Sequence, residues 1–232
     1  MPSIAFNNIP AIRDALKKYG IFNIRLQNSI LAVIGKESGF KPQSENLKYT
    51  TASRLKKVYT RIPDAMINSL LNNPVALGNY VYGGQYGTPA NAGYLYRGRG
   101  LNQITFFNNY KKVGDALKVD LIKNPDLLNK IEYAAPAAAI FYRDAFKIYQ
   151  SLIKKKYGID INNIQPGDKD ETILKAVVNI NAGMGAKDAL VLSEYGKSLP
   201  YLKLIQKEPI IQKNKIIIPL VIGAALLYFA FK

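Results

Sequence analysis

The 232-residue sequence contains no cysteine and no histidine. The absence of cysteine excludes disulfides, thiolate metal sites and thiol nucleophiles, and it fits a reducing compartment. The absence of histidine excludes Ser–His and Cys–His catalysis and most zinc chemistry. Acid–base chemistry near neutral pH must therefore fall to carboxylates, lysine or tyrosine. No pattern typical of metal ligands or of a phosphate-binding loop is present, so we expect no cofactor.

Acidic residues are also scarce, since 16 Asp and Glu stand against 32 Lys and Arg, giving a net charge of +16. This excess favours anionic partners such as nucleic acid, anionic lipid or cell-envelope polymers. The lysines are spread along the chain. The charge is therefore consistent with a generally basic surface and also with a dedicated anion-binding site. Nucleic-acid-binding domains typically cluster Lys and Arg on a groove-binding helix or an aromatic sheet. Because no such cluster is present, we expect no specific nucleic-acid partner.

The two ends of the chain differ in character. The N-terminal MPSIAFNNIP has no basic region followed by an apolar run, so we expect no signal peptide. Near the C-terminus, IIIPLVIGAALLYFAF (216–231) has no charged residue and lies between Lys215 and Lys232. As a helix it would be about 24 Å long, slightly short of a hydrocarbon core of about 30 Å, and the flanking lysines can reach the interface.

The lack of a polar face in 216–231 argues against a buried or surface helix of the globular domain. We therefore predict three parts: a globular domain at 1–206, a basic juxtamembrane linker at 207–215 and a transmembrane anchor at 216–231. The expected location is a membrane, with the lipid bilayer as a partner.

The globular part is predicted to be mainly α-helical, with at most a small sheet. Capping residues, Pro and Gly positions and apolar spacing predict the helices. A Gly- and Pro-rich run, YGGQYGTPANAG (82–93), is predicted to be a loop. The expected helices are 8–20, 23–36, one from Thr51 or Ser53, 72–82, 106–117, one from near Pro136 to 156, 170–180 and 185–206.

One carboxylate lies on an apolar helix face. Leu26, Ile30, Val33 and Glu37 follow at steps of four, three and four, so they share one stripe of a helix that ends at Ser38-Gly39. Glu37 is then expected to point toward the interior at the edge of the core, where desolvation raises the pKa of a carboxyl group. A glycosidase general acid needs this property. A partly buried glutamate satisfied by backbone N–H groups or by an arginine is the structural alternative.

A second carboxylate, Glu45, follows in KPQSENLKYT, a predicted loop or short strand. The chain can fold back there and place Glu45 across a cleft from Glu37. Most glycosidases need two carboxylates in different environments to break a glycosidic bond. Taken alone, Glu45 also fits a surface acid.

Three blocks of the sequence, ESGF…SENLKYT, YRGRGLNQIT…NNY and NINAG, closely resemble the catalytic domain of glycoside hydrolase family 19. Within that family they are most similar to endolysins of phages and prophages, which cleave peptidoglycan and share a lysozyme-like α+β fold with chitinases. The resemblance implies a lysozyme-like domain with a catalytic cleft. The matched blocks run from about Ile30 to Gly183.

The resemblance also implies roles for individual residues. Glu37 takes the place of the general acid, while Glu45 and the Thr105 hydroxyl would orient the attacking water. The arginines would build the cleft and could pair with the glutamates, and aromatics such as Tyr94, Phe106 and Phe107 can cover sugar faces, although the two phenylalanines are more typical of a core. The implied substrate-binding residues are Gln103, Asn109, Tyr110, Asn181, Tyr96, Arg97 and Arg99.

The sequence departs from the family pattern in ESGF, which is one glycine short, in the acid-free loop before YRGRG, and mildly in NINAG. Plant-type chitinases carry disulfides and take their second glutamate from another loop. Neither feature has a match in this sequence, so we favour peptidoglycan over chitin as the substrate. The expected function is a membrane-anchored peptidoglycan glycosidase acting on β-1,4 bonds, associated with a phage virion or with lysis, with other virion proteins as further partners. The alternatives are a lytic transglycosylase using Glu37 alone and an inactive sugar-binding or structural virion protein.

Overall fold

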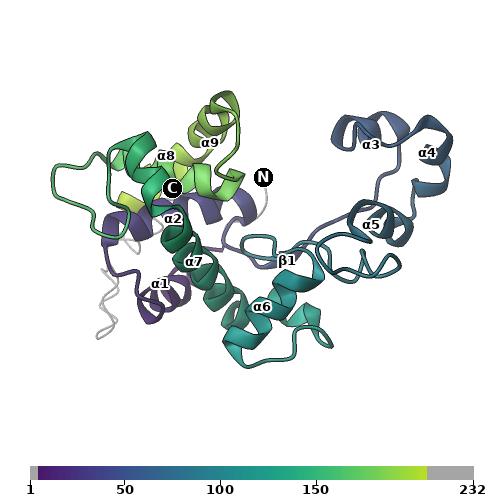
Figure 1. Cartoon of the computed structure of the whole chain (residues 1–232), viewed down its shortest axis with the longest axis horizontal. Helices are drawn as coiled ribbons and strands as arrows, with labels where there is room; N and C mark the ends of the chain where they lie inside the picture. The colour runs from purple at the N-terminus through teal and green to yellow at the C-terminus, as the bar shows by residue number, and fades with distance from the viewer. Residues whose placement is uncertain (1–4, 208–232) are drawn as a thin grey trace, which may run out of the picture.

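The computed structural model describes residues 5–207, which fold into helices around one short antiparallel ladder (Figure 1). The strands β1 (Gln43–Ser44) and β2 (Arg99–Gly100) pair Gln43 with Gly100 and Ser44 with Arg99. The mainly helical class with a small sheet is thereby confirmed. The helices are α1 Ile9–Lys18, α2 Ile24–Ser38, α3 Ala52–Val58, α4 Asp64–Leu70, α5 Pro74–Tyr82, α6 Phe107–Leu117, α7 Ile131–Tyr157, α8 Asp170–Ala182 and α9 Asp188–Lys207, with 3-10 turns η1 Phe6–Asn8 and η2 Pro125–Asn129.

Local capping signals set several of these boundaries. The Asn23 side chain accepts hydrogen bonds from the first turn of α2, and Gly39 ends that helix in the left-handed conformation. Thr51 and Asn73 cap α3 and α5 in the same way. Asn8 is the exception, because its side chain donates to the Phe40 carbonyl instead of capping α1. Helix α4 was not predicted from the sequence.

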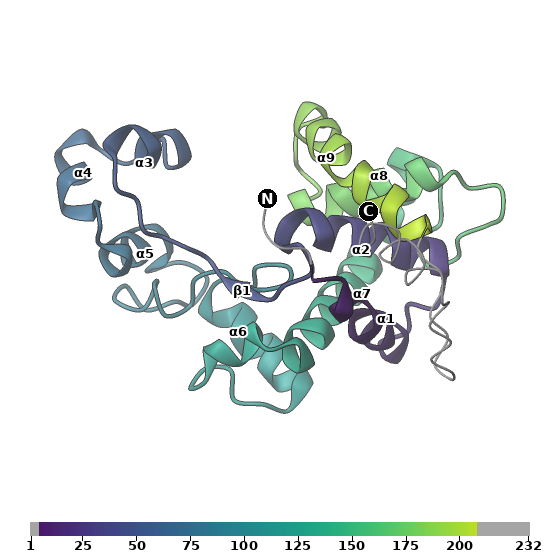
Figure 2. The same cartoon turned by 180° about the vertical axis from the view of Figure 1, so that it is seen from behind.

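The largest core joins α1, α2, α7, α8 and α9, which we call the helical lobe (Figures 1 and 2). Helix α7 contributes a run of small buried side chains, Ala134, Ala135, Ala138 and Ala139, and small side chains let neighbouring elements approach closely. The stripe Leu26, Ile30 and Val33 of α2 is buried in this core. The predicted apolar face of the second helix is therefore confirmed.

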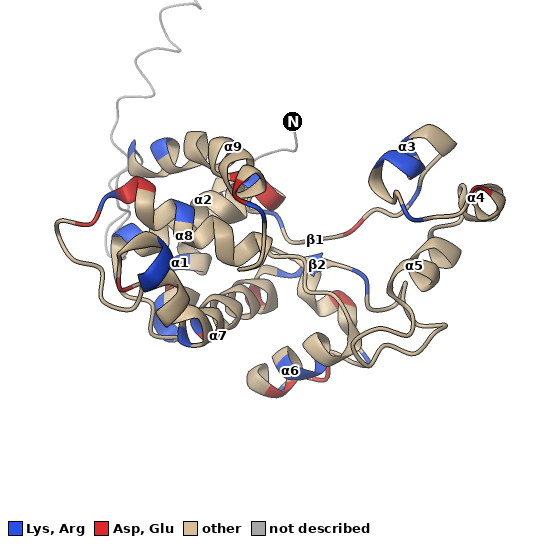
Figure 3. Ribbon diagram, turned by 45° about the horizontal axis from the view of Figure 1, so that its top comes forward, with Lys and Arg blue, Asp and Glu red and all other residues tan. Residues whose placement is uncertain are grey.

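Helices α3, α4 and α5 form a small lobe with a core of their own. That core consists of Leu47, Leu55, Ile62, Ile67, Leu70 and Leu77. A third cluster lies around α6 and holds Tyr96, Ile104, Tyr110, Val113, Leu121, Leu128 and Ala137. Figure 3 shows the β1–β2 ladder between the helical lobe and the small lobe, and Lys and Arg on helices of both lobes. The basic charge is thus distributed, as the sequence predicted.

The predicted transmembrane anchor at 216–231 and most of the linker at 207–215 lie outside the described residues. Among the helices within residues 5–207, none has the combination of length and apolar composition that crossing a bilayer requires.

Gly35 of α2 marks the closest approach of that helix to its neighbours. A Cβ atom at Gly35 would lie 2.6 Å from the Tyr201 ring and 2.7 Å from the Phe40 ring. These two rings pack edge to face, with centroids 6.3 Å apart. The contact between α2 and α9 therefore depends on the missing side chain.

We predict that Gly35→Ala lowers the free energy of unfolding by about 1–3 kcal/mol, because the added methyl group forces two packed rings to move. Gly196→Ala in α9 is the matched control, since a Cβ there meets nothing within 4 Å. The control is expected to gain up to about 1 kcal/mol from helix propensity. Denaturant unfolding of the two variants measures the difference, and equal stability would contradict the proposed close packing.

Candidate active site

Glu37 lies in the last turn of α2, at the mouth of a pocket of about 250 Å³. Its side chain keeps 29% of its surface exposed, so the carboxyl group is not enclosed by the apolar core as the stripe suggested. The reason is its place at the helix end, where the core of the lobe gives way to polar residues. The pocket is lined by Val33, Lys36, Glu37, Val178, Asn181, Ala182, Leu190, Glu194 and Ser198.

Asn181 of α8, which lines the same pocket, holds the Glu37 carboxyl group. Its amide nitrogen donates to Glu37 Oε1 over 2.9 Å. The Tyr142 hydroxyl of α7 donates to Asn181 Oδ1 over 3.4 Å, and burial together with the charge of Glu37 raises the Tyr142 pKa, so the hydroxyl stays protonated. The structure thus brings Asn181 beside Glu37, two residues separated by 144 positions in the chain.

A lysine shared by two carboxylates completes this half of the site. The Lys36 ammonium group pairs with Glu37 Oε1 and with Glu194 Oε2 of α9. Burial alone lowers the Lys36 pKa, but the hydrogen bonds that Lys36 donates to Glu194 and Glu37 outweigh it and raise the pKa above its ordinary value. Hydrogen bonds from Lys197 and Lys36 lower the Glu194 pKa. Lys36 is therefore a permanent cation whose charge is divided between two acids.

Glu45 lies directly after β1 and is held by tyrosines of the small lobe. The Tyr82 hydroxyl lies 2.9 and 2.8 Å from the two carboxylate oxygens, and the Tyr59 hydroxyl lies 3.3 Å from Oε1. Burial, followed by the negative charge of Glu45, raises the pKa of both tyrosines, so they remain donors. Within residues 5–207, Glu37 and Glu45 share no hydrogen-bond partner, and each has a separate setting.

The β1–β2 ladder connects Glu45 to the segment that carries Gln103. The Glu45 amide donates to the Gly98 carbonyl over 2.8 Å, next to the ladder. The Gln103 side-chain amide donates to the carbonyls of Gln43 and Gly100, both over 3.1 Å. Gln103 therefore bridges the two strands and lies beside the strand that leads to Glu45.

Thr105 and Asn109 follow on the same segment. The Thr105 hydroxyl donates to the Gln103 carbonyl over 2.9 Å, and the Asn109 amide donates to the Thr105 carbonyl over 2.8 Å. Asn109 is exposed and Thr105 is half-buried, so both side chains can be reached from solvent. Their local hydrogen bonds fix the directions in which these groups point.

The two arginines do not pair with the glutamates, which corrects that expectation. Arg99 is only 2% exposed and forms its ion pair with Asp126 of η2 over 2.7 Å. Arg97 donates to the backbone carbonyls of Glu45 and Tyr94, and its guanidinium carbon lies 4.0 Å above the Tyr94 ring centroid. Both guanidinium groups donate hydrogen bonds to backbone carbonyls and lie over tyrosine rings, because the chain folds tightly around them.

Tyr96 and Tyr110 also lie in the interior rather than at the surface. Tyr110 is fully buried, and its hydroxyl donates to the Arg97 carbonyl over 2.7 Å. Burial raises the pKa of Tyr110 to about 12 against the opposing charge of Arg99. The Tyr96 ring packs against Phe107 and Tyr110. These positions favour a scaffolding role beneath the exposed amides.

Sequence reasoning missed Lys36, Glu194, Tyr59 and Tyr82 as parts of the site. Lys36 precedes Glu37, but adjacent helix positions point in different directions, so the pairing was not evident. Tyr82 closes α5 just before the Gly-rich loop, and this position was the one local signal available. Nothing near Glu194 in the sequence indicates its partner, since the contact depends on α9 lying against α2.

We predict that Tyr82→Phe lowers kcat by about 10- to 100-fold, because a hydrogen bond to a charged carboxylate is worth about 1.5–3 kcal/mol. Tyr80→Phe, an exposed neighbour on the same helix, is the matched control and should leave kcat unchanged. Steady-state rates of glycosidic-bond hydrolysis, with melting temperatures to exclude unfolding, provide the measurement. Unchanged kcat in Tyr82→Phe would show that the Tyr82 hydrogen bond to Glu45 does not contribute to turnover.

Comparison with known proteins finds one family model that matches part of the chain. Residues 63–175 match the glycoside hydrolase family 19 model, described as chitinase class I. Chitinase C from Streptomyces griseus HUT6037 aligns at 17% identity and a TM-score of 0.46, over 89% of this chain and 71% of its own. A bacterial family 19 chitinase aligns at 19% identity and a TM-score of 0.44, over 90% of both chains. No curated protein sequence matches the chain.

The matched segment includes the whole Tyr94–Tyr110 block, with Gln103, Thr105 and Asn109. It begins after Glu37 and Glu45 and ends before Asn181, so the match does not include those three residues. Residues 63–175 of this chain are thus similar to the glycoside hydrolase family 19 domain.

Proposed function

We propose that this protein hydrolyses β-1,4 bonds between the N-acetylated amino sugars of bacterial peptidoglycan, with Glu37 as general acid and Glu45 as general base. The observation that carries the proposal is the pair of carboxylates in separate settings, one on the helical lobe and one at the ladder leading to the small lobe. Inverting glycosidases need two carboxyl groups far enough apart for a water molecule to enter between them.

The two carboxylate oxygens of Glu37 differ, because one is hydrogen-bonded to neighbouring side chains and the other is available to a substrate. Oε1 accepts from Asn181 and pairs with Lys36, whereas Oε2 makes no hydrogen bond within the part of the chain that the structure describes. A proton on Oε2 can therefore be delivered to a glycosidic oxygen that enters the pocket. Glu194 matters because it shares Lys36 and so reduces the positive charge acting on Glu37.

Glu45 is suited to activate water because donors fix both of its oxygens. The Tyr82 hydroxyl lies between the two oxygens, and a carboxylate held in one orientation loses less entropy when it takes up a proton from water. The Thr105 hydroxyl and the Gln103 and Asn109 amides supply hydrogen bonds to the N-acetyl and hydroxyl groups of the sugar.

Charge favours peptidoglycan over chitin as the substrate. Peptidoglycan carries stem peptides with carboxylates, whereas chitin is an uncharged polymer, and the chain has a net charge of +16. Opposite charges raise the rate of encounter between enzyme and polymer. The similarity of the ESGF…SENL and YRGRG blocks to phage and prophage endolysins supports the same substrate.

The test follows the clearing of purified cell walls by the full-length protein in detergent, with mass spectrometry of the fragments. We expect clearing, fragments with reducing ends and no anhydro ends. Glu37→Gln should lower the rate at least about 100-fold, since a positioned acid contributes 10²–10⁴. Glu132→Gln, an exposed glutamate in the first turn of α7, is the matched control.

Two outcomes would replace the proposal with one of its alternatives. Anhydro-sugar products with full activity in Glu45→Gln would identify a lytic transglycosylase that uses Glu37 alone. Binding of glycan strands without any cleavage, across a range of salt and pH, would identify a sugar-binding or structural protein.

The membrane part of the proposal rests on the sequence of residues 216–231. The uncharged segment anchors the protein in a bilayer, with the basic residues of 207–215 at an anionic lipid surface. A membrane-held wall hydrolase with phage-type motifs fits a virion component or a host-membrane lysis protein, in contact with other virion proteins in the first case.

We predict that the full chain stays in the membrane pellet after alkaline carbonate extraction, because a spanning apolar helix resists release by charge disruption. A chain ending at Lys207 is the control and should appear in the supernatant. Recovery of the full chain in the supernatant would contradict the anchor and leave the catalytic proposal untouched.

A further inference from the structure

Tyr86 is a large aromatic residue whose side chain lies exposed on the protein surface. It is 68% exposed and lies in the loop between α5 and β2, with a φ angle of +44°. Non-glycine residues rarely adopt positive φ, and such strain persists only where the surroundings hold it. Gln103 and Phe106, both in the candidate site segment, also have positive φ.

The loop around Tyr86 is fixed to the first turn of α6. The Tyr86 carbonyl accepts from the Asn108 amide over 3.2 Å, and the Thr88 hydroxyl accepts from the Phe107 amide over 3.0 Å. At Gly87 a Cβ atom would lie 2.3 Å from Asn108 Oδ1. The backbone that carries Tyr86 is therefore docked against the same segment that carries Thr105.

A line of aromatic contacts leads from Tyr86 to Glu45. The Tyr86 and Phe106 ring centroids lie 4.7 Å apart, and the Phe106 and Tyr82 centroids lie 5.6 Å apart. The Tyr82 hydroxyl then donates to Glu45. Tyr86 is thus an exposed ring packed on half-buried Phe106, which in turn packs on the tyrosine that holds Glu45.

We propose that Tyr86, supported by Phe106, forms a sugar-binding subsite in which one β-1,4-linked N-acetylated pyranose stacks its apolar face on the Tyr86 ring. The chain has no tryptophan, so tyrosine and phenylalanine must provide any aromatic stacking surface. A ring held rigidly before binding loses little entropy when a sugar stacks on it. The subsite rests on the proposed function, because it places the glycan beside Glu45.

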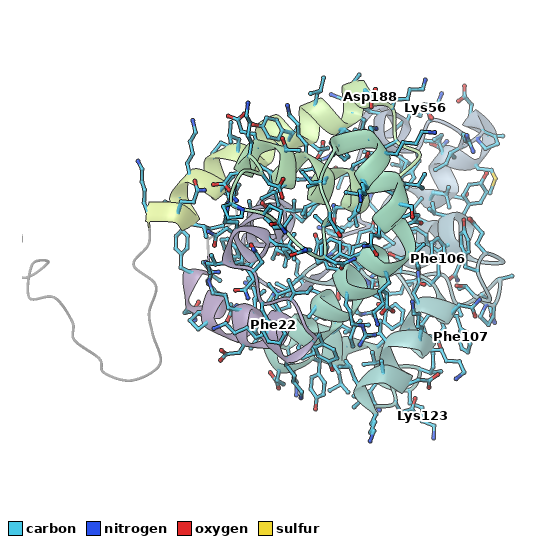
Figure 4. The ribbon with its side chains drawn as sticks, turned by 60° about the vertical axis from the view of Figure 1, so that its left-hand side comes forward. Phe22, Lys56, Phe106, Phe107, Lys123 and Asp188 are labelled. Atoms are coloured by element: carbon cyan, nitrogen blue, oxygen red, sulfur yellow. The ribbon has the colours of Figure 1, made fainter. Side chains whose placement is uncertain are left out.

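The experiment compares Tyr86→Ala with Phe22→Ala, a matched control that removes an equally exposed ring, 73% exposed, between α1 and α2 of the helical lobe. Figure 4 shows the labels of Phe22 and Phe106 on different parts of the molecule. We expect Tyr86→Ala to raise KM for glycan strands about tenfold with little change in kcat, since stacking on one aromatic ring contributes uniform binding energy. Tyr86→Phe should recover most of the lost affinity, because the ring face is kept.

A binding measurement separates failure of the subsite from failure of the proposed function. Calorimetry with soluble glycan fragments compares Glu37→Gln with the double variant Glu37→Gln/Tyr86→Ala, and needs no cleavage. A tenfold loss of affinity in the double variant supports the subsite even if the wild type cleaves nothing. Unchanged KM and unchanged affinity in the Tyr86→Ala variants, with the wild type active, would overturn the subsite alone.

Discussion

The half of the site that carries Glu45 depends on one buried guanidinium group. Arg99 donates to the carbonyls of Leu95 and Arg97 and to the Tyr110 hydroxyl, and it pairs with Asp126. A cation without these acceptors would be costly in the interior, so the chain around it has few alternative paths. Because Arg99 also lies in β2, it fixes the strand to which β1 and then Glu45 are attached.

The candidate site draws its two halves from elements with separate cores. Glu37, Lys36, Asn181 and Glu194 belong to the helical lobe, whereas the tyrosines around Glu45 belong to the small lobe. Polar groups in the two halves satisfy one another locally, through a shared lysine on one side and phenol donors on the other. A glycan bound between the halves would therefore meet two acids that differ in partners as well as in position. This difference is the usual basis for one carboxyl group giving a proton while another accepts one.

Several features of the fold were predictable from local sequence signals. Asn23, Gly39, Thr51 and Asn73 lie at helix ends in the structure because their side-chain or backbone preferences act within a few residues. The predicted buried stripe of the second helix was correct up to Val33. Its last member, Glu37, lies at a polar pocket rather than in the core. The family resemblance predicted that Asn181 and Glu37 lie in the same cleft, but it did not predict that they pair. No local rule connects residues in α2 and α8.

The sequence by itself determined the helical class, several helix ends, the basic charge and the absence of cysteine and histidine chemistry, since these follow from residue types and short-range periodicity. It also supplied the two carboxylates and the amide–hydroxyl segment as candidates. Only the tertiary structure decided that Arg99, Tyr96 and Tyr110 lie inside, that Lys36 is shared with Glu194, and that Tyr82 holds Glu45. These outcomes depend on which distant elements pack together, and burial and charge pairing are properties of that packing rather than of the local chain.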